Sequence, residues 1–269
     1  MQRVLRELKV FAGEIWNKRG LIWSLAKNDF RAQFAGSFFG ILWQFALPIV
    51  TMFVFWFVFT TFKSQPVDDI PFMAWFVPAY VPWMFFTDSM NGTTSSLYQY
   101  SYLVKKIRFR TALLPLVKIT TCLMINAFFI GFIFLIMLLY RVHLTWYCLQ
   151  FLYYLAGLIL LNVGLGWLLA SISVLFKDTA PLVNVVTQLG FWLTPIFWVV
   201  DGMPPWVQIL EKFNPMFYIT KGYRDSFLYG IGFWNYPGQT IFFWCLIFFL
   251  LALGAYVFHK LRPHFADVL

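Results

Sequence analysis

Charge is what this sequence has least of. Only 12% of its 269 residues are Asp, Glu, Lys or Arg, whereas about 25% of a soluble domain is charged. Hydrophobic residues make up 61% of the chain and aromatic residues 22%. So few charges cannot cover a water-exposed surface without large apolar patches. The composition excludes a soluble globular domain, a disordered chain, a disulfide scaffold and a nucleic-acid-binding domain, and it indicates a protein that folds in a lipid bilayer.

The sequence also lacks the motifs of common enzymes and nucleotide-binding proteins. It contains no G-x-x-x-x-G-K-[ST] phosphate loop, no His-Glu-x-x-His pair and no Cys-x-x-Cys pair. The three cysteines lie inside apolar runs without a shared spacing, which favours packed residues over disulfides or metal ligands. The three histidines lie at the ends of apolar runs, where solvated side chains are expected. The sequence therefore predicts no catalytic residue, no metal site and no cofactor on this chain.

Uncharged segments long enough to cross a bilayer are abundant, because a spanning helix needs about 20 mostly apolar residues. The segments expected to span are 38–62, 70–87, 119–140, 144–176, 179–200 and 238–258. Prolines in the segment 70–87 predict a kinked helix that could continue past Asp88. The segment 144–176 is long enough for its first part to lie at the membrane interface. The sequence thus predicts an all-α integral membrane protein with six transmembrane helices. We expect one domain over 1–269, divided into a cytoplasmic interfacial segment (1–37), the spans (38–260) and a cytoplasmic tail (261–269).

The distribution of basic residues predicts the orientation. The net charge is +9, and cytoplasmic loops of membrane proteins retain Lys and Arg. With the N-terminus inside, 15 Lys and Arg residues fall on the inner side and 5 on the outer side. Both termini are therefore expected in the cytoplasm.

Three segments outside the spans have distinctive patterns. Apolar residues at helical spacing among basic ones, from Val4 to Ile15, predict an N-terminal amphipathic helix on the inner surface. The basic loop KKIRFRTALLP (105–115) predicts a short helix parallel to the membrane, which is either a docking surface or a plain positive loop. The outer loop (201–237), broken by prolines, predicts re-entrant or interfacial helices.

Aromatic and acidic residues give the candidates for a transport path. Aromatic rings can bind sugars, although interfacial belts and lipid contact account for most of them. The candidates for a conduit wall on the first two spans are Trp43, Phe45, Trp75, Trp83 and Phe86. Charges inside membrane spans often mark ion or proton paths, and Asp88 is the main candidate for such a charge. Alternatively, Asp88 is a helix-end residue near the inner surface. Without a relay of such charges, an ion-driven transporter is disfavoured, so energy for uphill transport would come from another chain.

Four segments together resemble a known family. They are AGSFFGILWQFALPI (35–49), KKIRFRTALLPLVKI (105–119), LFKDTAPLVNVVTQLGFWLTPIFW (175–198) and NPMFYITKGYRDSFLYG (214–230). In order and spacing the chain resembles the permease subunit of ABC-2-type exporters of lipid-linked polysaccharides. The terminal LRPHFADVL (261–269) is most similar to the wall teichoic acid branch of Gram-positive bacteria. Two positions depart from the family pattern but keep its charge. The family's basic loop often reads Lys-x-x-Phe-Pro, whereas here Arg110 follows Phe109. The family often has Arg-Asp between the fourth and fifth spans, whereas here the pair is Lys177 and Asp178.

The resemblance implies a function and partners. Two copies of the chain would form a conduit in the cytoplasmic membrane of a Gram-positive bacterium, and two copies of a separate ABC ATPase would hydrolyse ATP with Mg²⁺. The permease would not itself be an enzyme, and its substrate would be wall teichoic acid on undecaprenyl diphosphate. The residues implied to couple to the ATPase are Lys105, Lys106, Ile107, Arg108, Phe109, Arg110, Lys177 and Asp178. The candidates for an outer gate are Trp206, Phe213, Tyr218 and Tyr223.

Two alternatives remain at this stage. An O-antigen or capsular polysaccharide exporter is the alternative within the same family. An intramembrane enzyme acting on polyprenyl-linked glycans belongs to another class and would need an acidic or histidine pair facing a cavity. The nearest acidic pair, Asp68 and Asp69, lies on a short outer loop, where a solvated turn is expected.

Overall fold

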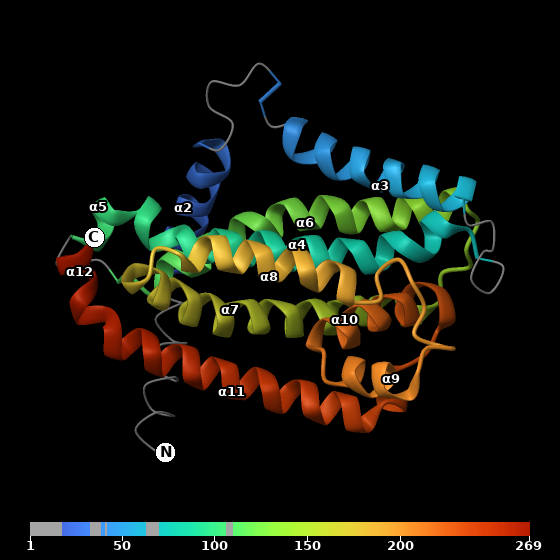
Figure 1. Ribbon diagram of the computed structural model, residues 1–269. Helices are drawn as coiled ribbons and strands as arrows, with labels where there is room; N and C mark the ends of the chain where they lie inside the picture. The colour runs from blue at the N-terminus through green and yellow to red at the C-terminus, as the bar shows by residue number, and fades with distance from the viewer. Residues whose placement is uncertain (1–17, 33–38, 41, 63–69, 106–109) are drawn as a thin grey trace.

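The fold consists of helices that run along a common direction. The computed structural model describes residues 18–32, 39–40, 42–62, 70–105 and 110–269. The long helices in these ranges are α3 (Leu42–Phe62), α4 (Phe72–Gln99), α6 (Leu113–Leu139), α7 (Phe151–Leu175), α8 (Thr179–Leu193) and α11 (Pro237–Leu261). In Figure 1 they run roughly side by side, with α3 at the top and α11 at the bottom.

The long helices differ in how well they suit a membrane. Four helical segments in the described ranges are long and apolar enough to span: Leu42–Thr61, Leu113–Leu139, Trp146–Leu175 and Pro237–His264. These correspond to α3, α6, α7 with the preceding 3-10 helix η1 (Trp146–Gln150), and α11. Helix α4 carries Asp88 and many hydroxyl groups, and α8 has only 15 residues. Length and composition alone therefore support four of the six predicted spans.

Helix α4 is the central element and is longer than expected. It packs against α6, α7 and α8, and most of its side chains are buried. Its hydroxyl groups donate hydrogen bonds to backbone carbonyls of the preceding turn, as Thr93 does to Ser89 (2.7 Å) and Thr94 to Met90 (2.7 Å). Hydroxyls satisfied in this way can be buried without interrupting the helix. The helix therefore continues to Gln99, well beyond the segment 70–87 predicted from apolar character.

A second correction concerns the basic loop and the third span. Lys105 lies in a turn after the short helix α5 (Ser101–Val104), and α6 already begins at Leu113. The end of the predicted surface helix over 105–115 is therefore the first turn of α6. The span begins six residues before the predicted 119, because Lys118 is buried with a partner instead of facing the cytoplasm. Residues 106–109, and the amphipathic positions from Val4 to Ile15, lie outside the described residues.

Short helices gather at the two ends of the bundle. At one end lie α2 (Arg19–Ala32), α5 and the C-terminal α12 (Phe265–Val268), which follows η4 (Arg262–His264) (Figure 1). At the other end lie α9 (Pro205–Lys212) and α10 (Pro215–Arg224). A π-helical turn, η2 (Asp225–Tyr229), and a 3-10 turn, η3 (Phe233–Asn235), follow α10. Helices α9, α10 and α11 each have proline at the first turn, where its missing N–H costs nothing.

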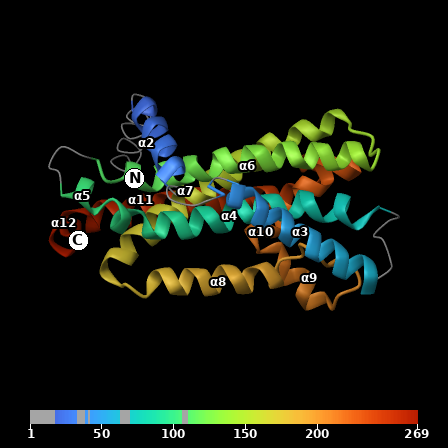
Figure 2. The ribbon, with the colours of Figure 1, turned by 90° about the horizontal axis from the view of Figure 1, so that it is seen from above.

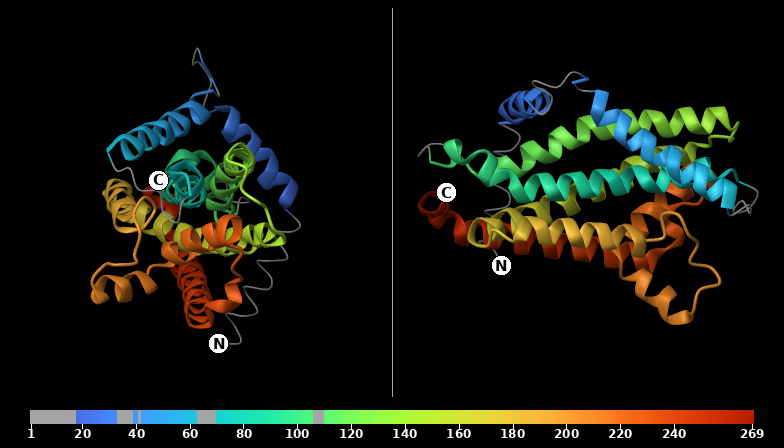
Figure 3. Two further views of the ribbon diagram at one scale, coloured as in Figure 1. Left: turned by 90° about the vertical axis from the view of Figure 1, so that its right-hand side faces the viewer. Right: turned by 45° about the horizontal axis from the view of Figure 1, so that its top comes forward.

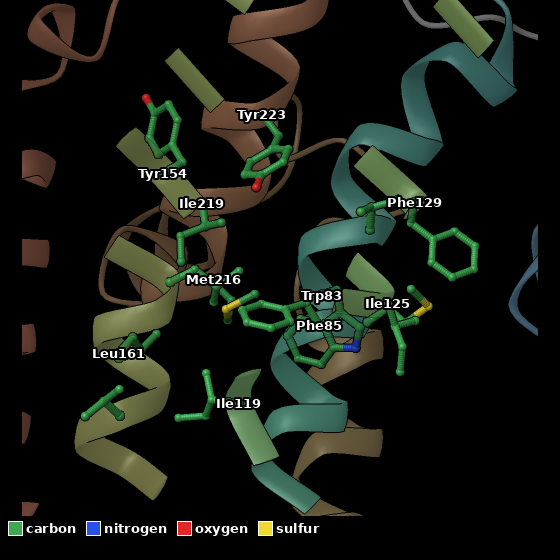
Figure 4. Close-up of a cluster of buried hydrophobic side chains, with 14 of the residues drawn as sticks. Trp83, Phe85, Ile119, Ile125, Phe129, Tyr154, Leu161, Met216, Ile219 and Tyr223 are labelled. Atoms are coloured by element: carbon green, nitrogen blue, oxygen red, sulfur yellow. The ribbon is translucent and has the colours of Figure 1, made fainter. Parts of the chain in front are cut away.

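The core lies where α10 enters between α4, α6 and α7. Figure 4 shows Met216 and Ile219 of α10 with Phe85 of α4, Ile119 of α6 and Leu161 of α7, all of them buried. A helix from the 201–237 loop therefore supplies core side chains to the bundle. Its buried position satisfies the requirement that non-spanning backbone at membrane depth be enclosed by protein.

Helices α7 and α11 touch backbone to backbone at two glycines. A Cβ atom at Gly254 would overlap the carbonyl oxygen of Gly164, and one at Gly164 would lie 2.9 Å from the carbonyl carbon of Leu250. Small residues at helix crossings allow this close approach, which maximises van der Waals contact in a lipid environment. The contact between α7 and α11 is among the most extensive in the bundle.

This crossing predicts a strong effect of one methyl group. We expect G254A to lower the free energy of unfolding by about 1–3 kcal/mol, because α11 must move away from α7. The matched control is G131A on α6, where a Cβ atom would meet nothing within 4 Å. Thermal unfolding of both variants in detergent checks the prediction. Equal melting temperatures for the two variants would contradict the close backbone contact.

Candidate functional site

A groove of about 610 Å³ lies between α3, α4 and α8. In the left panel of Figure 3, which looks along the bundle, α3 and α8 lie against neighbouring sides of α4. Figure 2 shows α8 beside α4, with α3 crossing over it. The groove is lined by Trp43, Gln44, Leu47, Pro48, Thr51, Phe55, Tyr80, Trp83, Met84, Thr87, Asp88, Asn91, Asn184, Thr187, Gln188 and Phe191. All three helices contribute both polar and aromatic side chains to this wall.

The polar side chains of the groove are unusual for apolar helices. Four are amides, from Gln44, Asn91, Asn184 and Gln188. Among the described residues these side-chain amides make no hydrogen bond within the chain, so they are available to a ligand or water. Polar groups in membrane helices normally face the protein interior or a water-filled cavity. Their arrangement on three neighbouring helices is therefore typical of a groove open to water or a ligand.

Aromatic rings form the second component of the groove. Phe191 of α8 lies with its ring centroid 6.2 Å from Trp83 and 5.7 Å from Phe55. Tyr80 completes the cluster, 6.1 Å from Phe191. At this spacing the rings contact one another in tilted and edge-on arrangements. The groove therefore combines flat apolar ring faces with hydrogen-bonding side chains, a combination typical of ligand sites.

The five aromatic residues predicted to line a conduit are divided by the structure. Trp43 and Trp83 line the groove, and Phe86 packs beside Trp83 at 5.5 Å between ring centroids. Phe45 instead contacts Phe128 of α6 (4.3 Å). Trp75 is buried beneath Arg224 near the other end of α4.

The polar residues of the groove were missed at the sequence level, except for Asp88. A signal exists in the sequence, because polar residues recur at helical spacing within each apolar segment. They lie at 44 and 51 on α3, at 80, 87 and 91 on α4, and at 184, 187 and 188 on α8. Spacings of three, four, seven and eleven residues place side chains on one helical face.

Arg224 forms a clamp at the end of the bundle that carries α9 and α10. It is 7% exposed. Its Nε donates to the carbonyl oxygen of Trp75 (3.1 Å), Nη1 to that of Pro195 (2.8 Å), and Nη2 to that of Ile196. The guanidinium also lies 3.4 Å from the ring centroid of Trp75. A planar fork with several donors suits this site, because one side chain ties α10 to α4 and to the segment after α8.

The four outer-gate candidates occupy two different environments. Trp206 and Phe213 are exposed on and just after α9, at 67% and 60%. Tyr218 and Tyr223 are buried on α10, at 5% and 0%. The Tyr218 hydroxyl hydrogen-bonds with Thr240 (2.8 Å) and with the Tyr153 hydroxyl (3.1 Å), which holds α10 against α11 and α7. The structure thus places two of the candidates on the exposed surface and two in the core.

A buried ion pair lies at the opposite end of the bundle. Asp29 of α2 accepts hydrogen bonds from the Lys118 ammonium (2.6 Å) and from the Tyr100 hydroxyl (2.6 Å). The side chains of Lys118 and Asp29 are 7% and 10% exposed. The Thr121 hydroxyl also donates to the carbonyl of Ala26 (3.3 Å). These contacts fix α2 against α6 and the end of α4.

The described ATPase-coupling candidates lie at this same end. Lys105 is exposed, and Arg110 is half-buried in the turn before α6. Lys177 and Asp178 are exposed in the turn between α7 and α8. Four further coupling candidates lie outside the described residues, namely Lys106, Ile107, Arg108 and Phe109. The acidic pair considered for an intramembrane enzyme, Asp68 and Asp69, also lies outside them. In the described residues no group of three or more His, Cys, Asp or Glu side chains could hold a metal ion.

The sequence matches one family of transport proteins over most of its length. Residues 20–228 match the family model described as ABC-2 type transporter. The chain therefore belongs to the ABC-2 type transporter family and is a membrane subunit of a transporter.

Three curated relatives have the same name, O-antigen export system permease protein RfbA. The relative from Myxococcus xanthus is 27% identical over 216 residues, which cover 80% of this chain and 82% of that protein. Two relatives from Klebsiella pneumoniae are 24% and 22% identical over 250 and 249 residues. Each of these two alignments covers 91% of this chain and 93% of the relative.

Proposed function

We propose that this chain is the permease subunit of an ATP-driven exporter that moves a polyprenyl-diphosphate-linked polysaccharide across the cytoplasmic membrane. The observation that carries the proposal is the groove of unpaired amides and aromatic rings between α3, α4 and α8. Family membership supports the export mechanism, and the names of the three relatives favour an O-antigen-type polysaccharide. Wall teichoic acid, expected from the resemblance of residues 261–269, is the second substrate candidate.

The helices beside the groove support a homodimer. Within the spanning window of α3, only 6% of the residues are buried. Large hydrophobic residues are also exposed on α8, namely Leu182, Val185, Val186, Leu189, Trp192 and Leu193. A second copy related by a two-fold axis would cover such surfaces and close the two open grooves into one conduit. The proposed functional unit therefore contains two copies of this chain.

All six long helices span the membrane in this proposal. Helix α4 tolerates Asp88 and its hydroxyl groups because α6, α7, α8 and α10 surround it. Helix α8 is about 22 Å long at the usual rise per residue, shorter than the roughly 30 Å hydrocarbon core. Its path through the bilayer is completed by residues 194–200, which lie beside α10 through the Arg224 contacts. The end with α2 and α12 faces the cytoplasm, as the distribution of basic residues predicts.

The energy source in this proposal is a separate ABC ATPase at the cytoplasmic end. Two copies would dock against the turns that contain Lys105, Arg110, Lys177 and Asp178. Asp29 connects α2 to α4 and α6 through Tyr100 and Lys118, so movement at α2 would reach the groove helices. At the outer end, α9 and α10 would gate the exit, with Trp206 and Phe213 on the exposed side.

The proposal is tested by co-purification and complementation. We expect this chain, expressed with the ATPase encoded beside it, to purify as a two-to-two complex that hydrolyses ATP. The complex should restore surface polysaccharide in a host that lacks its own exporter. The groove variant W83A should reduce export at least about tenfold, because a central ring face is lost, whereas W234A, an exposed tryptophan away from the groove, should leave it unchanged. A chain that purifies alone and restores no export would overturn the proposal.

A further inference from the structure

The charge of the groove wall is informative about the polymer. Among the described residues that line the groove, Asp88 alone is charged, and none is Lys, Arg or His. In the described part of the chain no salt bridge joins Asp88 to a basic side chain. The described part of the wall that a polymer would slide along therefore has one negative charge from each copy and no basic side chain.

Two buried basic side chains that contact α4 are already engaged. Lys118 lies behind α4, where its Cβ is 3.6 Å from a Cβ placed on Gly92, and its ammonium is held by Asp29. Arg224 is held by three carbonyl groups at the outer end. Both side chains are less than 8% exposed. Neither can reach a polymer in the groove without breaking buried hydrogen bonds.

Phosphate groups are recognised in proteins by Lys and Arg, and Arg forms paired hydrogen bonds to their oxygens. A phosphodiester-linked backbone in this groove would meet a carboxyl group and the faces of aromatic rings instead. Ring faces carry partial negative charge, so they too disfavour an anion. In a partly desolvated path the repulsion between like charges is stronger than in bulk water.

The same wall suits uncharged sugars. Amide and carboxyl groups can form hydrogen bonds with pairs of neighbouring hydroxyls, since amides both donate and accept. The partially positive C–H groups on the face of a sugar ring pack well on the negative face of an aromatic ring. Amides from Gln44, Asn91 and Gln188 lie in the same groove as the rings of Trp83 and Phe191.

We propose that the groove accepts a polymer of uncharged sugar units and disfavours a polymer linked by phosphodiesters. This inference rests on the proposed function, because it identifies the groove as the path of the polymer. Asp88 is the principal specificity residue, since it hydrogen-bonds to sugar hydroxyls and repels phosphate.

The test uses the purified complex with its ATPase in lipid nanodiscs. Two synthetic probes of equal length are added, a mannose oligomer and a glycerol phosphate oligomer, each on a polyprenyl diphosphate. Binding is followed by fluorescence anisotropy, and turnover by ATP hydrolysis. We expect the mannose oligomer to bind at least about tenfold more tightly and to stimulate ATP hydrolysis more strongly.

Two variants assign the preference to the groove. D88N should reduce the ratio of the two affinities by about tenfold, and Q188K should favour the glycerol phosphate oligomer. D201N removes an exposed carboxylate of the outer loop and should leave the ratio unchanged. Equal binding of the two probes, or a ratio that D88N does not alter, would overturn this inference while the exporter function stands. No response to either probe would instead overturn the proposed function.

Discussion

R224A is expected to be among the most destabilising single substitutions in this chain. It removes three hydrogen bonds and leaves the carbonyl groups of Trp75, Pro195 and Ile196 without their buried partner. Each unsatisfied buried polar group costs about 1–3 kcal/mol, so the total loss of stability should be about 3–5 kcal/mol. Thermal unfolding in detergent should show a large decrease in melting temperature.

The conservative variant R224K separates charge from geometry. A lysine ammonium keeps the positive charge but cannot place three donors in the plane of a guanidinium. We expect R224K to recover less than half of the stability lost in R224A. The control is K212A, at the exposed end of α9 in the same outer segment, which should remain within about 0.5 kcal/mol of wild type. Full recovery by R224K would mean that charge, and not the fork of donors, holds α10 in place.

The second large effect is expected at the buried ion pair. D29N leaves the ammonium of Lys118 buried without its carboxylate, and losing one partner of such a pair typically costs about 3–5 kcal/mol. K118M should also be destabilising, because the buried Asp29 carboxylate then loses the ammonium that faces it at 2.6 Å. Chemical unfolding of each purified variant measures these losses.

The double variant D29N/K118M provides the decisive comparison. It removes both charges, so we expect it to be more stable than either single variant, with a coupling energy of about 1–3 kcal/mol. K118M should also reduce the coupling between ATP hydrolysis and export, since α2 then loses its ionic contact with α6. Strictly additive effects in the double variant would indicate that the two side chains act independently.

Much of the helical framework could be predicted from apolar runs, whereas helix ends set by tertiary contacts could not. Each predicted segment overlaps one long helix, from 38–62 on α3 to 238–258 on α11. A continuation of the second span past Asp88 was considered, but its extent through Thr93 and Thr94 to Gln99 was not predicted. Hydroxyl groups lower the hydropathy there, although backbone carbonyls satisfy them. Lys118 is one of the 15 basic residues that the sequence assigns to the inner side. Its burial could not be predicted, because its partner Asp29 lies 89 residues away in the sequence.

The groove illustrates the same limit for the candidate site. The helical spacing of polar residues was visible within each segment, and Asp88 was recognised as an intramembrane charge. The neighbours of each helix were not visible, because packing of α3 and α8 against α4 is a property of the folded chain. Trp43 and Trp83 could not be distinguished from Phe45 and Trp75 for the same reason. All four are aromatic, and only tertiary packing decides which of them face the groove.

The glycine crossing of α7 and α11 has a mechanical consequence. Side chains can exchange rotamers and allow sliding, but backbone in direct contact has no such compliance. Helices α7 and α11 are therefore expected to move as one rigid unit, joined by the backbone contact of Gly164 with Gly254. Helix α3 packs chiefly on α4 through side chains, and most of it faces outward. If the conduit widens as each sugar passes, α3 would therefore move first, and the α7–α11 pair would keep its position.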